Sequence, residues 1–165
     1  MREAVGVLER ASEEHNFAHF STTDDRHGIV HVVGPEQGIP QPGLLLACGD
    51  SHTSIYRGLG CIAFRIGSTE VKRLLATQTL LQRKPKTMRI TINGELGFGV
   101  TAKDVILSVI REIGPAGGTE YAIENAGPVI EAMSLEGRMT VCDMTIEAGS
   151  RLVLSHQTIR QCLCS

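Results

Sequence analysis

The chain has 165 residues, enough for one domain with a hydrophobic core or for one section of a larger enzyme. It is 42% hydrophobic and 21% charged, as soluble globular proteins are, and 16 basic against 18 acidic residues give a net charge of −2. This balance argues against nucleic acid or an anionic membrane as a partner, and no apolar run approaches the roughly 20 residues of a membrane span.

The first part of the chain predicts one helix and two strands. Residues 2–15 combine an apolar face with charged side chains, which predicts a surface helix without a signal-peptide core and hence a cytoplasmic protein. Residues 28–33 (GIVHVV) predict a short strand, and the prolines and glycines of 34–43 predict an ordered loop without regular structure. Residues 44–47 (LLLA) lack polar alternation, which predicts a strand buried on both faces, as in a parallel sheet.

The second part alternates helices and strands. The expected elements are a helix over 70–81 capped by Ser68 or Thr69, a strand over 87–92, a helix from 101, a strand over 121–125, and helices over 128–134 and 138–148. Asn93-Gly94 signals a hairpin turn, and Thr101 with Asp104 forms a capping-box pattern. Because strands alternate with helices, the predicted fold class is α/β with a mainly parallel sheet.

The histidines and cysteines do not predict a self-contained metal site. The five cysteines are scattered and form no CxxC pair, so neither a disulfide framework nor a zinc site is expected. Cys48, Cys61 and Cys142 stand in apolar surroundings that are typical of small buried residues. His27 and His31 are four residues apart, but in a strand they would not share a helical face, so an HxxxH metal site is not expected.

The stretch 48–53 (CGDSHT) combines three reactive side chains at the end of a predicted strand. Gly49 allows a sharp turn there, and ligands of open α/β sheets bind at the carboxyl ends of strands. Asp50, Ser51 and His52 then supply an acid, a hydroxyl and an imidazole together. An Asp-Ser turn that caps the next helix, with His52 merely exposed, explains the local pattern equally well.

Three further ionisable residues stand out, because burying such groups is costly unless they are paired or ligate something. For His31 alone, a core histidine that bonds a backbone carbonyl is the favoured interpretation over a ligand. Asp143 and Glu147 are four residues apart and would share one helix face, which is either solvated or, given its apolar neighbours, part of a site.

A series of ordered motifs then resembles a known family. The motifs are GIVHVVGPEQG (28–38), CGDSHT (48–53), IGSTEV (66–71), LATQT (75–79), GVTAKDVIL (99–107), AGGT (116–119) and EGRMTVCDMTIEAG (136–149). Over about residues 15–151 they resemble the large subunits of 3-isopropylmalate dehydratases, in the aconitase family. The resemblance implies an α/β/α domain and a hydro-lyase of leucine biosynthesis, which interconverts 2-isopropylmalate and 3-isopropylmalate through isopropylmaleate.

The same resemblance implies roles for particular residues. His31, Asp50, Ser51, His52 and Glu147 correspond to active-site residues of the family, which act beside the hydroxy-acid substrate. Asp143 corresponds to a cofactor-binding position near the family's [4Fe-4S] cluster, where asparagine is usual. The free iron of that cluster acts as a Lewis acid on the departing hydroxyl. The small subunit, the family's partner, is a separate chain.

The chain also departs from the family. The cluster cysteines, one alone and two as CxxC, have no counterpart here, so residues 1–151 are expected to form a partial aconitase-like domain and 152–165 a tail that does not match. A changed reading frame or a truncated gene would explain this tail, and we expect the chain alone to be inactive. A non-catalytic remnant or binding module, and a hydro-lyase for another alkyl-malate, remain alternatives. Arg57 and Arg65 replace small residues, which costs stability if the backbone there has positive φ or packs closely.

Overall fold

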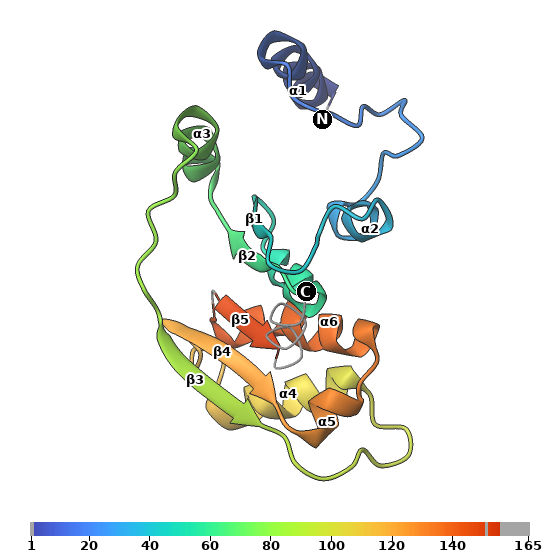
Figure 1. Cartoon of the computed structure of the whole chain (residues 1–165), viewed down its shortest axis with the longest axis vertical. Helices are drawn as coiled ribbons and strands as arrows, with labels where there is room; N and C mark the ends of the chain where they lie inside the picture. Colours follow the sequence, from blue (N-terminus) through green and yellow to red (C-terminus); the bar gives the residue numbers. More distant parts are fainter. Residues whose placement is uncertain (1, 151, 156–165) are drawn as a thin grey trace. The chain divides into compact units, whose positions relative to one another are not determined.

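The computed structural model describes residues 2–150 and 152–155 (Figure 1), in two units that divide between Ile39 and Pro40. In chain order the elements are α1 (Arg2–His15), α2 (Val30–Glu36), β1 (Leu45–Cys48), the 3-10 helix η1 (Thr53–Leu59), β2 (Ile62–Arg65), α3 (Ser68–Thr77), β3 (Lys86–Thr91), α4 (Ala102–Ile113), β4 (Tyr121–Ala126), α5 (Pro128–Ala132), α6 (Leu135–Met144), the 3-10 helix η2 (Thr145–Ala148) and β5 (Leu152–Ser155). The alternation of helices and parallel strands confirms the α/β class.

The first unit contains the two helices α1 and α2. α1 confirms the predicted surface helix, whereas the strand predicted over 28–33 is wrong, because α2 occupies most of that stretch and extends to Glu36. The N–H groups of Val32 and Val33 both donate to the carbonyl oxygen of Ile29 at 2.9 Å. Local bonds of this kind satisfy backbone groups that a strand could satisfy only beside a neighbour. The start of the loop predicted over 34–43 is therefore helical as well.

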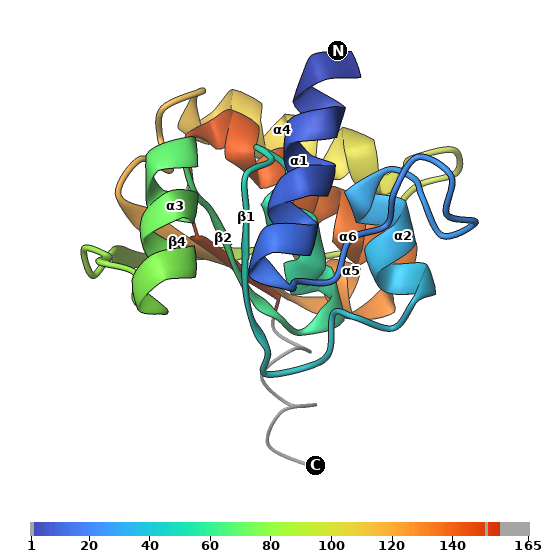
Figure 2. The same cartoon turned by 90° about the horizontal axis from the view of Figure 1, so that it is seen from above.

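A two-stranded parallel sheet opens the second unit, with β1 and β2 side by side (Figure 2) and Leu45 opposite Ile62. η1 connects the two strands, and the buried residues Tyr56, Cys61 and Ala63 form their common core. The prediction of a strand buried on both faces is wrong, because Leu45 is 65% exposed and the rest of β1 is only half-buried. β1 pairs with a single described strand, so part of its surface stays open to water.

β3, β4 and β5 form a second parallel sheet with β4 in the middle. Figure 1 shows α4, α5 and α6 together beside this sheet, and Ile106, Ile130 and Val141 form the buried core of these helices. The hairpin predicted at Asn93-Gly94 is wrong, because β3 pairs in parallel with β4. Parallel neighbours need a crossover connection, and here the turn leads into α4, which supplies it.

The predicted ends of the helices are confirmed in one case and wrong in others. The capping box of α4 is confirmed: the N–H of Thr101 donates to Asp104 at 2.8 Å, and the hydroxyl of Thr101 accepts the N–H of Asp104 at 3.4 Å. For α3 the predicted caps are wrong, because Gly67 is the N-cap and the helix ends at Thr77, four residues before the predicted end. The helix predicted over 138–148 is α6 followed by η2, so no single α-helix carries both Asp143 and Glu147.

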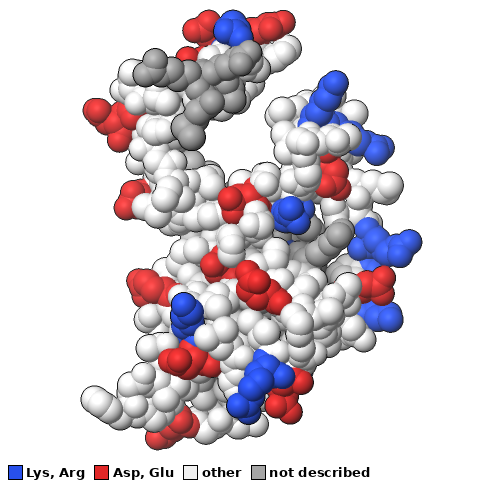
Figure 3. All heavy atoms as spheres, turned by 180° about the vertical axis from the view of Figure 1, so that it is seen from behind, with Lys and Arg blue, Asp and Glu red and all other residues white. Residues whose placement is uncertain are grey.

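Neither the charges on the surface nor the described helices indicate a special environment. Acidic and basic side chains are interspersed over the face shown in Figure 3, without a large region of one sign. Among the residues that the structure describes, none of the helices has the length and apolar character that a membrane crossing requires.

Candidate functional site

The polar turn after β1 is held by its own first residue. The Oδ1 atom of Asp50 accepts the backbone N–H of His52 at 2.8 Å, and the hydroxyl of Thr53 donates to the carbonyl oxygen of Asp50 at 2.6 Å. An aspartate that bonds the backbone two residues on is an Asx turn, which here leads the chain from β1 into η1. The Asp-Ser turn, expected from the sequence as the alternative explanation of residues 48–53, is therefore present in the structure.

The same explanation leaves His52 merely exposed, and this is wrong, because its side chain contacts a distant part of the chain. Its Nδ1 atom lies 3.0 Å from the Oδ1 atom of Asp143, a residue 91 positions further along the chain. The two side chains are 43% and 25% exposed, so the pair lies at the edge of the protein rather than in its core. The hydroxyl of Ser54 also donates to the backbone carbonyl oxygen of Asp143 at 3.3 Å. Two contacts, one from the polar turn and one from η1, thus reach the C-terminal end of α6.

Close packing of η1 against α6 places this pair. A Cβ atom on Gly58 of η1 would lie 2.9 Å from the Cα and 2.8 Å from the Cγ atom of Met139 in α6. Real Cβ atoms are essentially never below 3.0 Å, so the two backbones can approach this closely only because residue 58 is glycine. The hydroxyl of Thr145 donates to the carbonyl of Val141 at 2.5 Å and supports the end of α6.

A buried arginine lies behind the polar turn. Arg57 of η1 is 0% exposed, and its Nη2 atom donates a hydrogen bond to the carbonyl oxygen of Ala63 in β2. Its guanidinium carbon lies 5.9 Å from the ring centre of Phe64. Burial lowers the pKa of Arg57 to about 10. Burial also raises the pKa of Cys142 to about 12, and the nearby charge of Arg57 opposes that rise.

The two unusual arginines differ in their surroundings. Neither has positive φ, since the described non-glycine residues with positive φ are Asn16, Gln78 and Glu120. Arg57 meets the other expected condition, close packing, whereas Arg65 is exposed at the end of β2. A stability cost at Arg65 is therefore not supported, and the cost at Arg57 comes from a buried charge rather than from the backbone.

The remaining predicted site residues stand apart from the contacts above. Ser51 is exposed within the turn, and Glu147 is exposed on η2, without a hydrogen bond to the turn among the residues described. His31 is half-buried on α2 of the first unit, so its distance from the turn is not defined. The convergence of His31 and Glu147 with the turn stays a prediction.

The described cysteines do not form a cluster site. Cys61 and Cys142 are buried, as predicted, and Cys48 is half-buried. Within residues 2–150 and 152–155, no three His, Cys, Asp or Glu side chains are grouped so that they could hold a metal ion. A [4Fe-4S] cluster, which is held by thiolates, does not fit the donors of this part of the chain.

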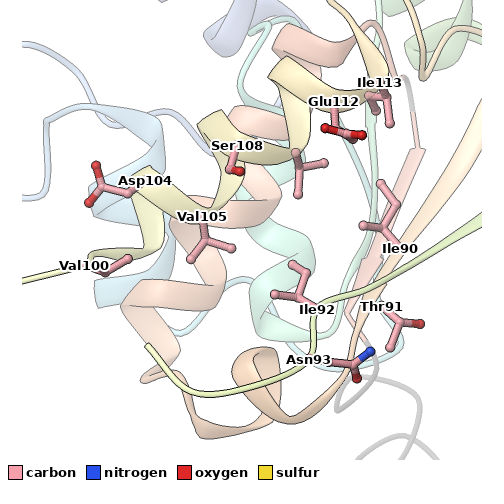
Figure 4. Close-up of a pocket in the computed structure, with 11 residues that line it drawn as sticks. Ile90, Thr91, Ile92, Asn93, Val100, Asp104, Val105, Ser108, Glu112 and Ile113 are labelled. Atoms are coloured by element: carbon pink, nitrogen blue, oxygen red, sulfur yellow. The ribbon is translucent and has the colours of Figure 1, made fainter. Parts of the chain in front are cut away.

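Two further features of the second unit were not predicted. A hollow lies between β3 and α4 (Figure 4), where Ile90 and Val105 are among the apolar lining residues and Asp104 and Glu112 among the polar ones. None of the predicted site residues lines this hollow, although the predicted capping residue Asp104 does. Asn125 of β4 is 1% exposed, and its side-chain amide has no hydrogen-bond partner in the described part of the chain.

Some of these contacts have no signal in the sequence. The pairing of His52 with Asp143 joins distant positions, so neither a spacing nor a motif indicates it. Residues 58–68 are rich in glycine, which is compatible with close packing, but nothing in the sequence identifies Met139 as the partner of Gly58. Ser54 follows the recognised DSHT stretch directly and could have been included with it.

Comparisons with known proteins agree with the resemblance in the sequence. A model of the aconitase family (aconitate hydratase) matches residues 1–158. Two curated relatives, the 3-isopropylmalate dehydratase large subunits of Psychrobacter arcticus and Psychrobacter cryohalolentis, are each 55% identical to this chain over 148 residues. The matched region covers 90% of this chain but 31% of each relative, so the chain spans about a third of the length of these relatives.

Proposed function

Because the chain belongs to the aconitase family, we propose that it carries part of the active site of a 3-isopropylmalate dehydratase large subunit. The observation that carries this proposal is 55% identity over 148 residues to two large subunits of that name. The reaction would be the hydro-lyase interconversion of 2-isopropylmalate and 3-isopropylmalate through isopropylmaleate. The position of the polar turn after a parallel strand supports the proposal, since ligands of α/β folds bind at such strand ends.

The proposed site residues are His31, Asp50, Ser51, His52 and Glu147. Dehydration and rehydration need groups that hold a hydroxyl or water in place and that accept and return protons. Asp50 fixes the backbone of His52, and His52 and Ser51 then present an imidazole and a hydroxyl at the surface of the turn. Glu147 follows α6, the helix whose end already contacts that turn, and would supply a second acid.

A cluster and a partner belong to the same proposal. When bound, a [4Fe-4S] cluster supplies a Lewis acid for the departing hydroxyl, but the described residues do not provide its ligands. Donors from elsewhere in a large subunit would therefore have to hold it, with Asp143 nearby. We propose a small subunit of isopropylmalate dehydratase as the partner, since the relatives are named large subunits. A cytoplasmic location stays a prediction.

A chimera tests the proposal in a complete enzyme. Residues 1–150 of this chain replace the matching segment of the Psychrobacter arcticus large subunit, which is produced with its small subunit under anaerobic conditions with iron and sulfide. We expect hydration of isopropylmaleate, followed by the loss of its ultraviolet absorbance, and a loss of about 10²–10⁴-fold in kcat for His52→Ala. Arg65→Met, at an exposed position of β2, is the control and should leave the rate unchanged.

The outcomes separate the alternatives. A chimera that loads the brown cluster but does not hydrate isopropylmaleate would overturn the proposal and favour a non-catalytic module. A segment that cannot replace its counterpart at all would count against the proposal too, because 55% identity predicts an interchangeable fold. Faster hydration of a different alkyl-substituted maleate would point to the related hydro-lyase instead.

A further inference from the structure

His52 is held from two sides, which leaves one ring atom available. Its backbone N–H is bonded to Asp50, and its Nδ1 atom is bonded to Asp143. Within the part of the chain that the structure describes, the other ring nitrogen, Nε2, has no hydrogen-bond partner. The side chain is 43% exposed, so a small molecule or water can reach the ring.

The chemistry of the partner decides which ring nitrogen carries the proton. An ionised carboxylate can only accept hydrogen bonds, and a neutral imidazole has one N–H. A carboxylate 3.0 Å from Nδ1 therefore requires that the proton lie on Nδ1, which leaves a lone pair on Nε2. An asparagine side chain both donates and accepts, so an amide at this position would permit either tautomer.

Packing rather than charge fixes the geometry of the pair. An exposed ion pair by itself contributes little and holds its side chains loosely. Here Ser54 bonds the backbone of Asp143, and Gly58 allows η1 to lie against Met139 of α6. Both ends of the pair are thus anchored in elements that pack closely together.

From these contacts we propose that Asp143 is a positioning residue, which holds His52 in the Nδ1–H tautomer so that Nε2 accepts a hydrogen bond from a hydroxyl or water. This inference rests on the proposed function for its role in the reaction, but not for the tautomer itself. In a hydro-lyase the bound group would be the hydroxyl of the hydroxy-acid or the water that is released. Asp143 would not contact the reacting atoms.

Nitrogen NMR tests the tautomer in the whole 165-residue chain. The chain is produced with ¹⁵N-histidine and studied at a pH at which the imidazole is neutral, because the two tautomers then give distinct nitrogen shifts and couplings. We expect the Nδ1–H tautomer for His52, assigned with His52→Gln. Asp143→Asn should convert at least half of the population to the Nε2–H form.

A matched substitution serves as the control. Asp104→Asn removes a carboxylate that bonds only the start of α4, so the tautomer of His52 should not change. Nε2–H in the unsubstituted chain, or no change with Asp143→Asn, would overturn the inference. The first of these results comes from the unsubstituted chain alone, so the test does not depend on the folding of a variant.

A second arm uses the chimera described above. There Asp143→Ala should lower kcat about tenfold at nearly constant KM, and Asp143→Glu should restore part of that loss. A fall of kcat together with a rise of KM, with an unchanged tautomer, would indicate a merely structural residue. An inactive chimera in which His52 keeps Nδ1–H would instead overturn the proposed function alone, since the tautomer is measured without substrate or cluster.

Discussion

Replacing Arg57 by methionine should stabilise the chain, because the substitution removes a buried charge while it keeps an unbranched side chain in place. The fall in the pKa of Arg57 from its ordinary value to about 10, at roughly 1.4 kcal/mol per pKa unit, corresponds to about 3 kcal/mol of destabilisation in the folded state. The charged hydrogen bond to Ala63 returns about 1.5–3 kcal/mol. We therefore expect a net gain of about 1 kcal/mol, or about 2–4 °C in Tm.

Urea and thermal unfolding followed by circular dichroism at pH 7 measure this gain. Arg65→Met is the matched control, because the same substitution at an exposed end of β2 should change the free energy of unfolding by less than about 0.5 kcal/mol. A loss of more than about 1 kcal/mol in Arg57→Met would refute the reasoning, since the hydrogen bond would then outweigh the cost of burying the charge.

The pH dependence gives an independent check on the same charge. Because the pKa of Arg57 is lower in the folded state, the folded protein binds fewer protons than the unfolded chain between about pH 10 and the ordinary pKa of arginine. The free energy of unfolding therefore rises with pH in that window, and below it the full cost of burying the charge of Arg57 is present. The difference between Arg57→Met and the unsubstituted chain should shrink as the pH rises from 10 toward 12. A constant difference would show that the charge is not its cause.

Three further substitutions test other contacts by the same unfolding measurements. Gly58→Ala should cost about 1–3 kcal/mol, since its Cβ would meet the backbone of α6 at 2.9 Å, whereas Gly49→Ala, with open space around its Cβ, should change little. Thr101→Ala should cost about 1 kcal/mol and Thr101→Ser much less, because serine keeps the capping hydroxyl. The hydroxyl and N–H of Thr101 hold the pKa of Asp104 below its usual value, so this stabilisation should be lost as the pH falls through the lowered pKa. In Thr101→Ala the loss should be smaller but still present, because the backbone N–H of residue 101 still bonds Asp104. Asn125→Leu should stabilise by about 1–3 kcal/mol, and a loss there would mean that the buried amide has a partner.

Elements with a local cause were predictable from the sequence. The capping box of α4 depends on two residues three apart, and the buried stripe of that helix repeats with its turn, so both appear in the chain itself. β1 and β3 were found for the same reason, within one or two residues of their ends. β2 was not found, because it lies in a glycine-rich stretch and forms beside β1.

Two of the errors concern segments whose structure depends on a neighbouring strand. Residues 28–33 are mostly apolar and β-branched, which is typical of strands, yet without a described partner strand residues 30–33 belong to the helix α2. Asn93-Gly94 is a strong hairpin signal, but a hairpin needs an antiparallel neighbour, and β3 instead pairs in parallel with β4. In both cases the local pattern allows the predicted conformation, and the presence or direction of a neighbouring strand determines which conformation the chain adopts.

In the candidate site, too, local features are predictable from the sequence and contacts between distant residues are not. The Asx turn at Asp50 and the reactive residues after it follow from three adjacent letters of the sequence. In the sequence, Asp143 stands out only as an acid at a position where the family usually has asparagine, which would add negative charge near an anionic substrate. In the structure that carboxylate contacts the ring of His52 at 3.0 Å, so part of its hydrogen-bonding capacity is directed to the imidazole. The departure from the family therefore has two consequences, an added negative charge and a proton fixed on Nδ1 of the neighbouring histidine, and the nitrogen spectrum of that histidine tests the second of them.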